Sequence, residues 1–361
     1  MHYWDYIKVN DLLSLQTGGG DDEAVLDNDE VLFIVVHQVY ELWFKLALRE
    51  LVSARNLFHQ NPVPDMAMAS AVRSLKRVTT LFRQAASHFE VVETLTTRDY
   101  LAFRDKLIPA SGFQSAQIRE IEIVLGLDDK QRISLGPAGT YKDALRERDG
   151  SASSALKKVE ARIADGPSLR DVVYAWLKRT PVSREGPSKF VEGILAAHRS
   201  EIENRLRIAE EKMHPTPAER DLLRERYAKE LQFAEAFLRA EDDPEASAEK
   251  RVEVQKLRAA LMFLESHREL PRLAWPREVV DALIEMEQAV IVWRQRHARM
   301  VERVIGRRIG TGGSSGVDYL DETALRYRVF GDIWAVRTLL LRKAAVPPID
   351  NADDFRFRVE D

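Results

Sequence analysis

Helical patterning runs through almost all of this chain, and the strict alternation typical of strands is hard to find in it. Helix-breaking residues are few, with 17 glycines and 14 prolines among 361 residues. One apolar stripe near the C-terminus follows a three-four spacing, which places its members on one face of a helix. The stripe consists of Leu283, Met286, Val290, Trp293, His297, Met300 and Val304. The sequence therefore predicts an all-α fold.

The expected helices cover most of the length. We expect them over about 29–58, 66–92, 96–107, 115–126, 168–178, 187–197, 277–306 and 322–343. The segment 127–165 contains LGPAGT and DGSASS and is expected to be loop-rich. Neither a repeat nor a long linker divides the chain, so we expect a single domain over 1–361.

Residues 200–268 are highly charged, and His214-Pro215-Thr216-Pro217 interrupts them. Acidic and basic residues are interspersed there, which favours two or three antiparallel helices with solvated faces over a polyionic binding segment. We therefore expect 200–268 to form a peripheral charged helical hairpin appended to a helical bundle.

The overall charge excludes several kinds of partner. A formal net charge of -4 provides no basic field to collect nucleic acid or an anionic membrane. No uninterrupted apolar run approaches the roughly 20 residues needed to span a bilayer. The stretch MHYWDYIKVNDLL lacks the basic and apolar regions of a secretory signal. We expect a cytoplasmic protein without a nucleic-acid or membrane partner.

The chain contains no cysteine. Disulfide scaffolds, thiolate zinc sites, cysteine nucleophiles and cysteine-held iron–sulfur clusters are therefore excluded. Any metal or haem has to be held by histidine, carboxylate, tyrosine or methionine side chains.

Two histidines lie among apolar residues. His37 is in FIVVHQVYELWFK, and His297 belongs to the apolar stripe described above. Each is either a core histidine with satisfied hydrogen bonds or a polar group held in a dry pocket for chemistry. Together, in a helical chain without cysteine, they make a haem or metal pocket a hypothesis. The pair His37 and Glu41 has i, i+4 spacing, which alone is weak support for a metal site.

Tyr100 and Arg104 are four residues apart and share a helix face. A guanidinium beside a phenol is suited to hold a carboxylate through two parallel hydrogen bonds. The alternative is that Arg104 is an ordinary surface arginine. The turn that follows contains Ser111, whose hydroxyl would lie near the same pocket. IGTGGSSGVDYL, 309–320, lacks a GK[ST] ending and follows a helix, so we expect a mobile lid here in preference to a phosphate-binding loop.

Four stretches together resemble one family, the tryptophan 2,3-dioxygenases. They are FIVVHQVYELWFK, FRDKLIPASGFQS, WRQRHARMVERVIG and GTGGSSGVDYL, and they occur in the family's order and roughly its spacing. YWDYIKVNDLLSLQ and the RTP at 179–181 fit the same pattern, and the similarity is weakest over 127–165 and 200–255. The resemblance implies an all-helical homotetramer with one b-type haem per subunit. It also implies opening of the indole ring of L-tryptophan by dioxygen to give N-formyl-L-kynurenine, in tryptophan catabolism through the kynurenine pathway.

The resemblance also implies roles for single residues. His297 matches the proximal haem-iron ligand, and His37 matches the distal histidine that contacts the indole N–H. Phe33 matches a residue that packs against the indole. Arg104 and Tyr100 match the pair that binds the substrate carboxylate.

Further residues match on the lid and at the N-terminus. Thr311 matches a loop threonine that touches the ammonium and carboxylate groups of the substrate, and Ser111 lines the distal side. Tyr3, Tyr6 and Ile7 match an N-terminal segment that the family inserts into a neighbouring subunit's pocket.

The chain departs from the family pattern at Trp4, where glycine is usual, and at Asp321, where a basic residue is often found. The segment 127–165 is also atypical. These departures keep open a sibling haem oxygenase acting on a substituted tryptophan or another indole, or oxygenation without ring cleavage. A third alternative, from another class, is a haem-binding sensor or carrier without turnover. The carboxylate-binding pair argues against the sensor, which needs no such clamp.

Overall fold

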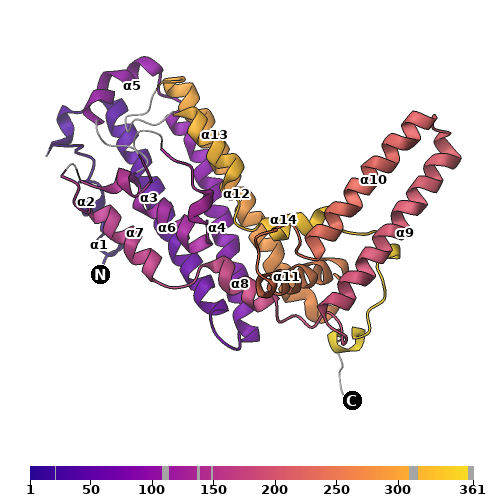
Figure 1. Cartoon of the computed structure of the whole chain (residues 1–361). Coiled ribbons are helices and arrows are strands. Elements are labelled where there is room, and N and C mark those ends of the chain that lie inside the picture. The colour runs from indigo at the N-terminus through magenta and orange to yellow at the C-terminus, as the bar shows by residue number, and fades with distance from the viewer. Residues whose placement is uncertain (21, 108–113, 136–138, 148, 309–315, 357–361) are drawn as a thin grey trace. The chain divides into compact units, whose positions relative to one another are not determined.

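The computed structural model describes residues 1–20, 22–107, 114–135, 139–147, 149–308 and 316–356. Within these ranges the regular structure is helical, and the only β-type pairing is an isolated bridge between Arg146 and Ala152. The predicted all-α fold is confirmed (Figure 1). The chain divides into two compact units, which are described separately.

Unit 1 comprises Met1–Asn56, Ser70–Arg170 and Glu285–Val329. Its helices, some of which also contribute residues to unit 2, are α1 (Tyr3–Tyr6), α2 (Val9–Leu12), α3 (Asn28–Phe58), α4 (Asp65–Val92), α5 (Thr97–Phe103), η2 (Arg104–Leu107), α6 (Ala116–Leu125), η4 (Asp129–Gln131), α7 (Ser154–Ala164), α12 (Ala274–Ile305) and α13 (Val317–Arg326). Short polar side chains begin two of them, since Thr96 caps α5 and Ser115 caps α6.

Aromatic side chains join the long helices of unit 1. Phe44 of α3 lies edge-on to Trp293 of α12, with 5.5 Å between ring centroids. Phe82 of α4 contacts the same indole at 5.7 Å. Such edge-to-face pairs add to the burial of apolar area that holds helices together. The apolar faces predicted for α3 and α12 therefore meet at Trp293, which belongs to the stripe that contains His297.

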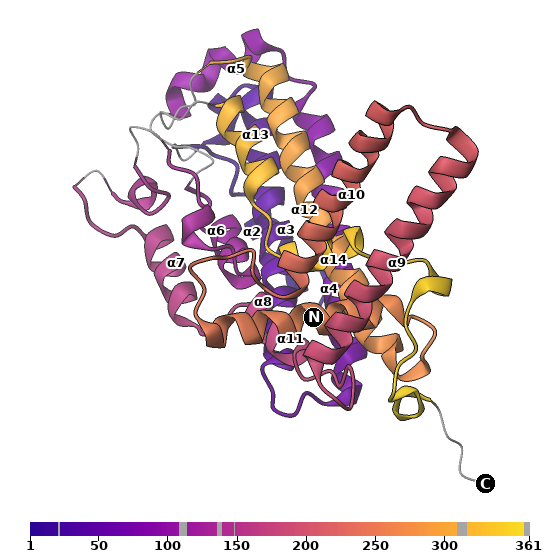
Figure 2. The same ribbon diagram turned by 45° about the vertical axis from the view of Figure 1, so that its right-hand side comes forward.

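Unit 2 comprises Leu57–Ala69, Asp171–Ile284 and Phe330–Asp361. Its helices are α8 (Leu169–Leu177), α9 (Pro187–Met213), α10 (Pro217–Leu238), α11 (Ala248–Ser266) and α14 (Gly331–Thr338). Figures 1 and 2 show α9 and α10 as an antiparallel pair. Ion pairs link the two helices, with nitrogen–oxygen distances of 2.6 Å for Arg220–Glu210 and 3.2 Å for Arg205–Glu230. Acids and bases of the charged segment thus pair with each other.

Three helix predictions were wrong in extent. Residues 187–213 form one helix instead of a short helix followed by a separate hairpin. The segment 127–165 contains α7, in which buried Leu156 and Val159 lie on one face and the Ser153 hydroxyl caps the first turn. The last predicted helix is two, α13 and α14, separated near Val329. Its amide donates to the Glu287 carboxylate at 2.6 Å, so a side chain satisfies the interrupted backbone.

Within the described chain, one helix, α3, is long and apolar enough to cross a membrane by length and composition alone. A core helix of a soluble protein meets the same criteria, so this is weak support for a span. Only 28% of its most apolar window is buried, and Val35, Leu42 and Leu46 are exposed. The outer face of α3 is therefore apolar and uncovered in the single chain.

Candidate functional site

A cavity of about 530 Å³ lies within unit 1, and α3, α4, α5, α6, α12 and α13 all contribute to its wall. Its volume falls within the range of about 300–1,000 Å³ usual for small-molecule sites. Among the predicted site residues, the cavity is lined by Phe33, His37, Tyr100, Arg104 and His297. Residues from three separate sequence stretches therefore meet at one site.

His37 presents its ring to the cavity. Its side chain is exposed to the cavity, although protein surrounds it at a slightly greater distance. Nδ1 lies 2.7 Å from the carbonyl oxygen of Phe33. A carbonyl only accepts hydrogen bonds, so Nδ1 carries the proton and Nε2 of the neutral ring is an acceptor. Burial lowers the pKa of His37, against the opposite effects of the Phe33 carbonyl and Glu41, and so favours this neutral form.

His297 belongs to the opposite wall, on α12. Burial lowers the pKa of His297 to about 4, and the neighbouring His37 ring and the charge of Arg294 lower it further. The imidazole is therefore neutral at physiological pH and has the lone pair that a metal ligand needs. The ring stacks on Phe89 with 5.4 Å between centroids and on Trp293 with 5.6 Å, and these contacts fix its plane.

Tyr100 and Arg104 share the end of the cavity near Phe33, whose ring centroid is 6.0 Å from that of Tyr100. Burial raises the pKa of Tyr100, while the charge of Arg104 and its hydrogen bond to the phenol act in the opposite direction. Lys106, two residues after Arg104, forms a 2.6 Å ion pair with the buried Glu30 carboxylate at the start of α3. This pair attaches η2 to α3 and thereby positions Arg104.

Five predicted site residues remain to be placed relative to the cavity. Ser111 and Thr311 lie outside the residues that the structure describes, as does most of the predicted lid. Tyr3, Tyr6 and Ile7 do not line the cavity of their own chain and are 76%, 75% and 42% exposed. Their insertion into a neighbouring subunit stays a prediction.

The two departures from the family pattern have local partners. Trp4 donates its indole N–H to the Asn10 side chain at 2.9 Å and is itself half exposed. Asp321 of α13 forms an ion pair with Arg299 of α12. Neither side chain lines the cavity.

Several residues that line the cavity were not predicted as site residues, although Glu41 was noted for its spacing from His37. Glu41 borders the cavity one turn after His37 and accepts a 2.8 Å hydrogen bond from Gln117 of α6. Arg119, Glu122 and Arg294 also line it. The i, i+3 spacing of Arg294 and His297 was a visible signal, but nothing in the sequence brings α6 next to α12.

The residues present fit a porphyrin better than a bare metal ion. Among the described residues, no group of three or more histidine, cysteine, aspartate or glutamate side chains gathers that could hold a metal ion. A porphyrin supplies four nitrogen ligands of its own, so a single histidine such as His297 suffices on the protein side. The cavity also combines apolar walls with a few polar groups, as cofactor sites do.

Fold and site together define a class of all-helical proteins that enclose a small-molecule site between their helices. In this chain, two of the helices each carry a neutral histidine that faces the site. The model of the family described as tryptophan 2,3-dioxygenase matches residues 1–340. The chain is 62% identical to "Tryptophan 2,3-dioxygenase" of Sorangium cellulosum, over 100% of this chain and 88% of that protein. It is 55% identical to "Tryptophan 2,3-dioxygenase 2" of Ralstonia nicotianae, over 100% and 98%. With "Tryptophan 2,3-dioxygenase B" of Danio rerio it shares 35% identity, over 99% and 86%. The chain belongs to the tryptophan 2,3-dioxygenase family, and the predicted resemblance is confirmed.

Proposed function

We propose that this enzyme opens the indole ring of L-tryptophan with dioxygen and releases N-formyl-L-kynurenine. In this reaction the C2–C3 bond of the indole breaks, and one oxygen atom goes to each of the two carbons. All atoms of both substrates are retained in the product, so no further oxidant or reductant is needed. Family membership and the names of the relatives support this reaction over an oxygenase acting on a different indole.

One observation carries the proposal: an acceptor and a pair of donors line the same apolar cavity. The acceptor is Nε2 of His37, since Nδ1 is already bonded to Phe33. The donors are the guanidinium of Arg104 and the phenol of Tyr100. An indole N–H matches the first, and an amino acid's carboxylate matches the second.

The chain's own residues orient the substrate and exclude water. Phe33 would pack against the indole plane, and His37 would accept its N–H, so that the reacting double bond is held in a fixed direction. Because the ring of His37 is neutral, it can also take up a proton at Nε2. Arg104 and Tyr100 would hold the carboxylate, with Ser111 and Thr311 as further predicted contacts.

The cofactor that we propose is non-covalent b-type haem, one per subunit, whose iron would be held by His297. When bound, the iron supplies the dioxygen chemistry, while the protein supplies orientation and a dry cavity. The neutral imidazole of His297 and its stacking on Phe89 support this assignment.

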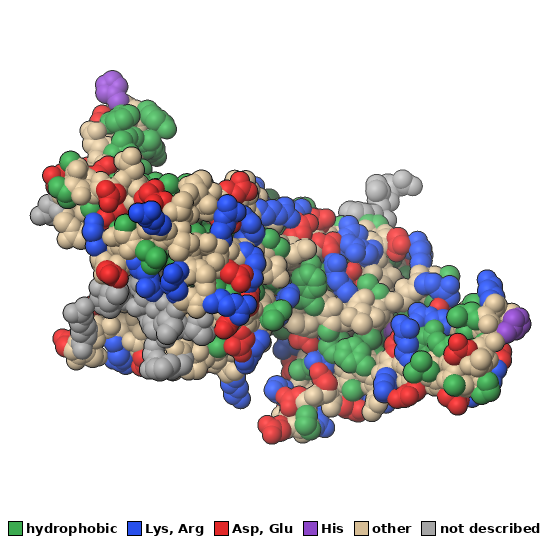
Figure 3. Space-filling view, turned by 90° about the horizontal axis from the view of Figure 1, so that it is seen from above, with side chains coloured by type: hydrophobic (Ala, Val, Ile, Leu, Met, Phe, Trp, Pro, Cys, Tyr) green, Lys and Arg blue, Asp and Glu red, His purple; other side chains and the backbone are tan. Residues whose placement is uncertain are grey.

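We also propose a homotetramer in which residues 1–10 help to build a neighbour's pocket. Figure 3 shows hydrophobic side chains gathered at the N-terminal segment, at the upper left. Tyr3 and Tyr6 are each about three-quarters exposed, and α3 adds an exposed apolar face. Contiguous exposed apolar surface often marks a site of contact between proteins. The cytoplasmic location, the absence of nucleic-acid and membrane partners and the single domain over 1–361 stay predictions.

The test is to incubate the ferrous, haem-loaded protein with L-tryptophan in air and to follow the absorbance of N-formylkynurenine. We expect one molecule of N-formylkynurenine for each molecule of L-tryptophan consumed. Product from a substituted tryptophan but none from L-tryptophan would favour the sibling oxygenase, and haem binding without any product would favour the sensor.

A further inference from the structure

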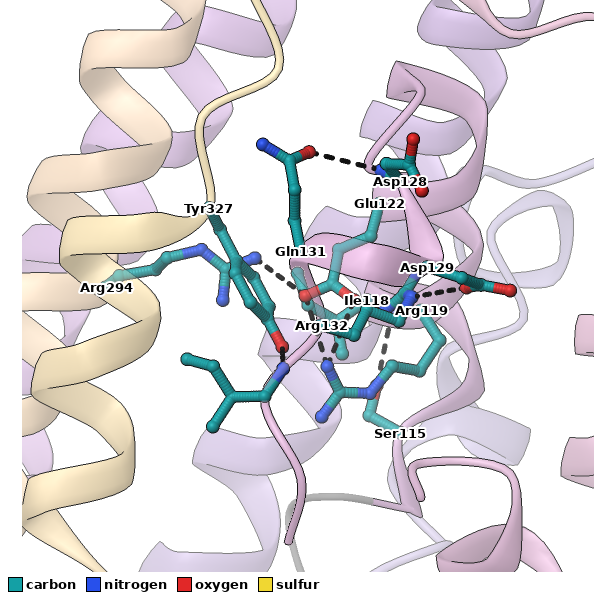
Figure 4. Close-up of polar contacts among 11 residues, drawn as sticks. Ser115, Ile118, Arg119, Glu122, Asp128, Asp129, Gln131, Arg132, Arg294 and Tyr327 are labelled. Carbon is teal, nitrogen blue, oxygen red and sulfur yellow. Dashed lines mark hydrogen bonds and ion pairs between the residues drawn. The ribbon is translucent and has the colours of Figure 1, made fainter. Parts of the chain in front are cut away.

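Three arginines converge on one buried carboxylate, Glu122, which lines the same cavity as the two histidines (Figure 4). Glu122 of α6 is 2% exposed. Its oxygens accept hydrogen bonds from Arg132 Nη1 at 2.6 Å, Arg294 Nη2 at 2.7 Å, and Arg119 Nη1 at 3.0 and 3.1 Å. We call these four residues the Glu122 cluster.

The Glu122 cluster has more positive charge than its own carboxylate can balance. Arg132 also holds Asp129, an exposed carboxylate, at 3.0 Å, so this arginine has a second anion on the solvent side. Arg119 and Arg294 are left to share Glu122. The Nε atoms of both are buried without a hydrogen-bond partner. Buried charge that is only partly balanced is costly, so a further anion at Arg119 and Arg294 would be stabilising.

The same two arginines border the cavity. Arg119, Glu122 and Arg294 line it, whereas Arg132 does not. Arg294 precedes His297 by three residues on α12, which is less than one helical turn, about 4.5 Å along the axis. An anion bound by Arg119 and Arg294 would therefore lie beside whatever His297 holds.

We propose that Arg119 and Arg294 bind carboxylate groups of the cofactor itself, the propionates of the haem. The inference rests on the function proposed above and adds the site for the anionic edge of the cofactor. Haem carries two propionates, and planar guanidinium groups bind carboxylates with two parallel hydrogen bonds. The other carboxylate available to this cavity belongs to the substrate, for which Arg104 and Tyr100 are the proposed partners.

The experiment compares binding of ferric haem with binding of its dimethyl ester, which keeps the ring and iron but lacks both charges. Affinities are measured by Soret titration of haem-free protein in the absence of tryptophan. The parent is expected to prefer haem at least tenfold, which corresponds to about 1.4 kcal/mol. Arg119→Gln and Arg294→Gln should each reduce this preference at least about fivefold. Because the result is a ratio of ratios, differences in solubility between the two porphyrins cancel.

The matched control is Arg132→Gln, which removes the same charge and one Glu122 contact but does not touch the cavity. It should lower thermal stability and leave the preference within about twofold of the parent. Arg119→Lys and Arg294→Lys serve if the glutamine variants fail to fold; they keep the charge and should lose part of the preference.

The outcomes separate the inference from the proposed function. A parent that binds haem through His297 but shows no preference over the ester overturns the inference alone. So does an equal loss in Arg132→Gln, or an effect confined to L-tryptophan affinity, which would assign Arg119 and Arg294 to the substrate carboxylate. A parent that binds neither porphyrin overturns both.

Discussion

His37 and Arg104 present opposite hydrogen-bonding character to one cavity. The imidazole is neutral and offers an acceptor at Nε2, because its other nitrogen donates to Phe33. The guanidinium can only donate. A ligand that fits both has an N–H on its apolar part and an anionic group at its other end, as an indole amino acid has.

Replacing Arg104 tests the anionic end. Truncating one side of a buried charged pair typically costs about 2–5 kcal/mol, and about 1.4 kcal/mol is a tenfold change. Arg104→Ala should therefore raise the KM for L-tryptophan at least tenfold, and Arg104→Lys should restore only part of it. Tryptamine, which has no carboxylate, is the control: its weak binding should hardly change. Equal losses for both ligands would show that Arg104 is not the carboxylate anchor.

Replacing His297 tests the cofactor ligand. His297→Ala removes the only lone pair that we assign to the iron, so the purified variant should retain little haem and lose its Soret band. His37→Ala is the matched control, since this ring lies at the same cavity but should not hold the iron. Full haem retention with an unchanged Soret band in His297→Ala would contradict the assignment.

The sequence alone indicated the site residues that are spaced one helical turn apart. His37 and Glu41 are one turn apart, as are Tyr100 and Arg104, and all four line the cavity. It was insufficient for the Glu122 cluster, because Arg294 is separated from Glu122 by 172 residues. Only the packing of helices brings such side chains together.

At the scale of whole elements, Gly316 determines how the chain enters α13. Its φ of 61° and ψ of −116° are accessible to glycine, and a Cβ there would lie 2.8 Å from the carbonyl oxygen of Arg308. Gly316→Ala should lower the free energy of unfolding by about 1–3 kcal/mol more than Gly306→Ala, the range typical of forced overpacking. Gly306 has a similar φ of 63° but nothing within 4 Å of its Cβ position. Urea denaturation of both variants measures the difference, and equal losses would exclude the close approach as its cause.

The contact of α6 with α12 predicts a pH dependence of stability. Burial alone would raise the pKa of Glu122, but Arg119, Arg294 and Arg132 outweigh it and hold the pKa far below its ordinary value. A depressed folded-state pKa gives stability that is present above the unfolded pKa of about 4.3 and is lost as pH falls below it. Glu122→Gln should cost about 3–5 kcal/mol at pH 7, typical of a broken buried pair.

The difference in the free energy of unfolding between the parent and Glu122→Gln should be constant between about pH 5.5 and 7. It should narrow below about pH 4.5, because only the parent has a titrating carboxyl group at position 122. Denaturation series at several pH values give this difference directly. A gap that widens on acidification would show that Glu122 is not a stabilising anion.

Helix extents were predicted where the apolar period is long and uninterrupted, as in α3 and α4. The errors in helix extent arose where side chains distant in sequence determine the helix boundaries. Glu287 accepts the amide of Val329 at the break between α13 and α14, and no local signal reports that contact. The serine-rich DGSASS was assigned to a loop, although Ser153 caps the start of α7. A serine predicts a cap as well as a turn, and tertiary packing decides between them.

At the scale of the whole molecule, the exposed aromatic N-terminus is the segment that we propose contributes to a neighbouring subunit's pocket. Removing residues 1–10 should raise the KM for L-tryptophan, because part of each pocket wall would be missing, while the haem spectrum stays largely unchanged. Steady-state kinetics and sedimentation of the truncated protein check both parts. Normal affinity for the substrate in the truncated protein would mean that the N-terminus is not part of the pocket.

Helix α6, ten residues long, is bonded at both of its sides. Gln117 donates to Glu41 on the helix of His37, while Glu122 accepts from Arg294 on the helix of His297. One inserted or deleted residue between them would rotate one contact by about 100° relative to the other and break it. Natural variants and designed chimaeras should therefore tolerate changes of length at the α9–α10 turn, but not between Gln117 and Glu122.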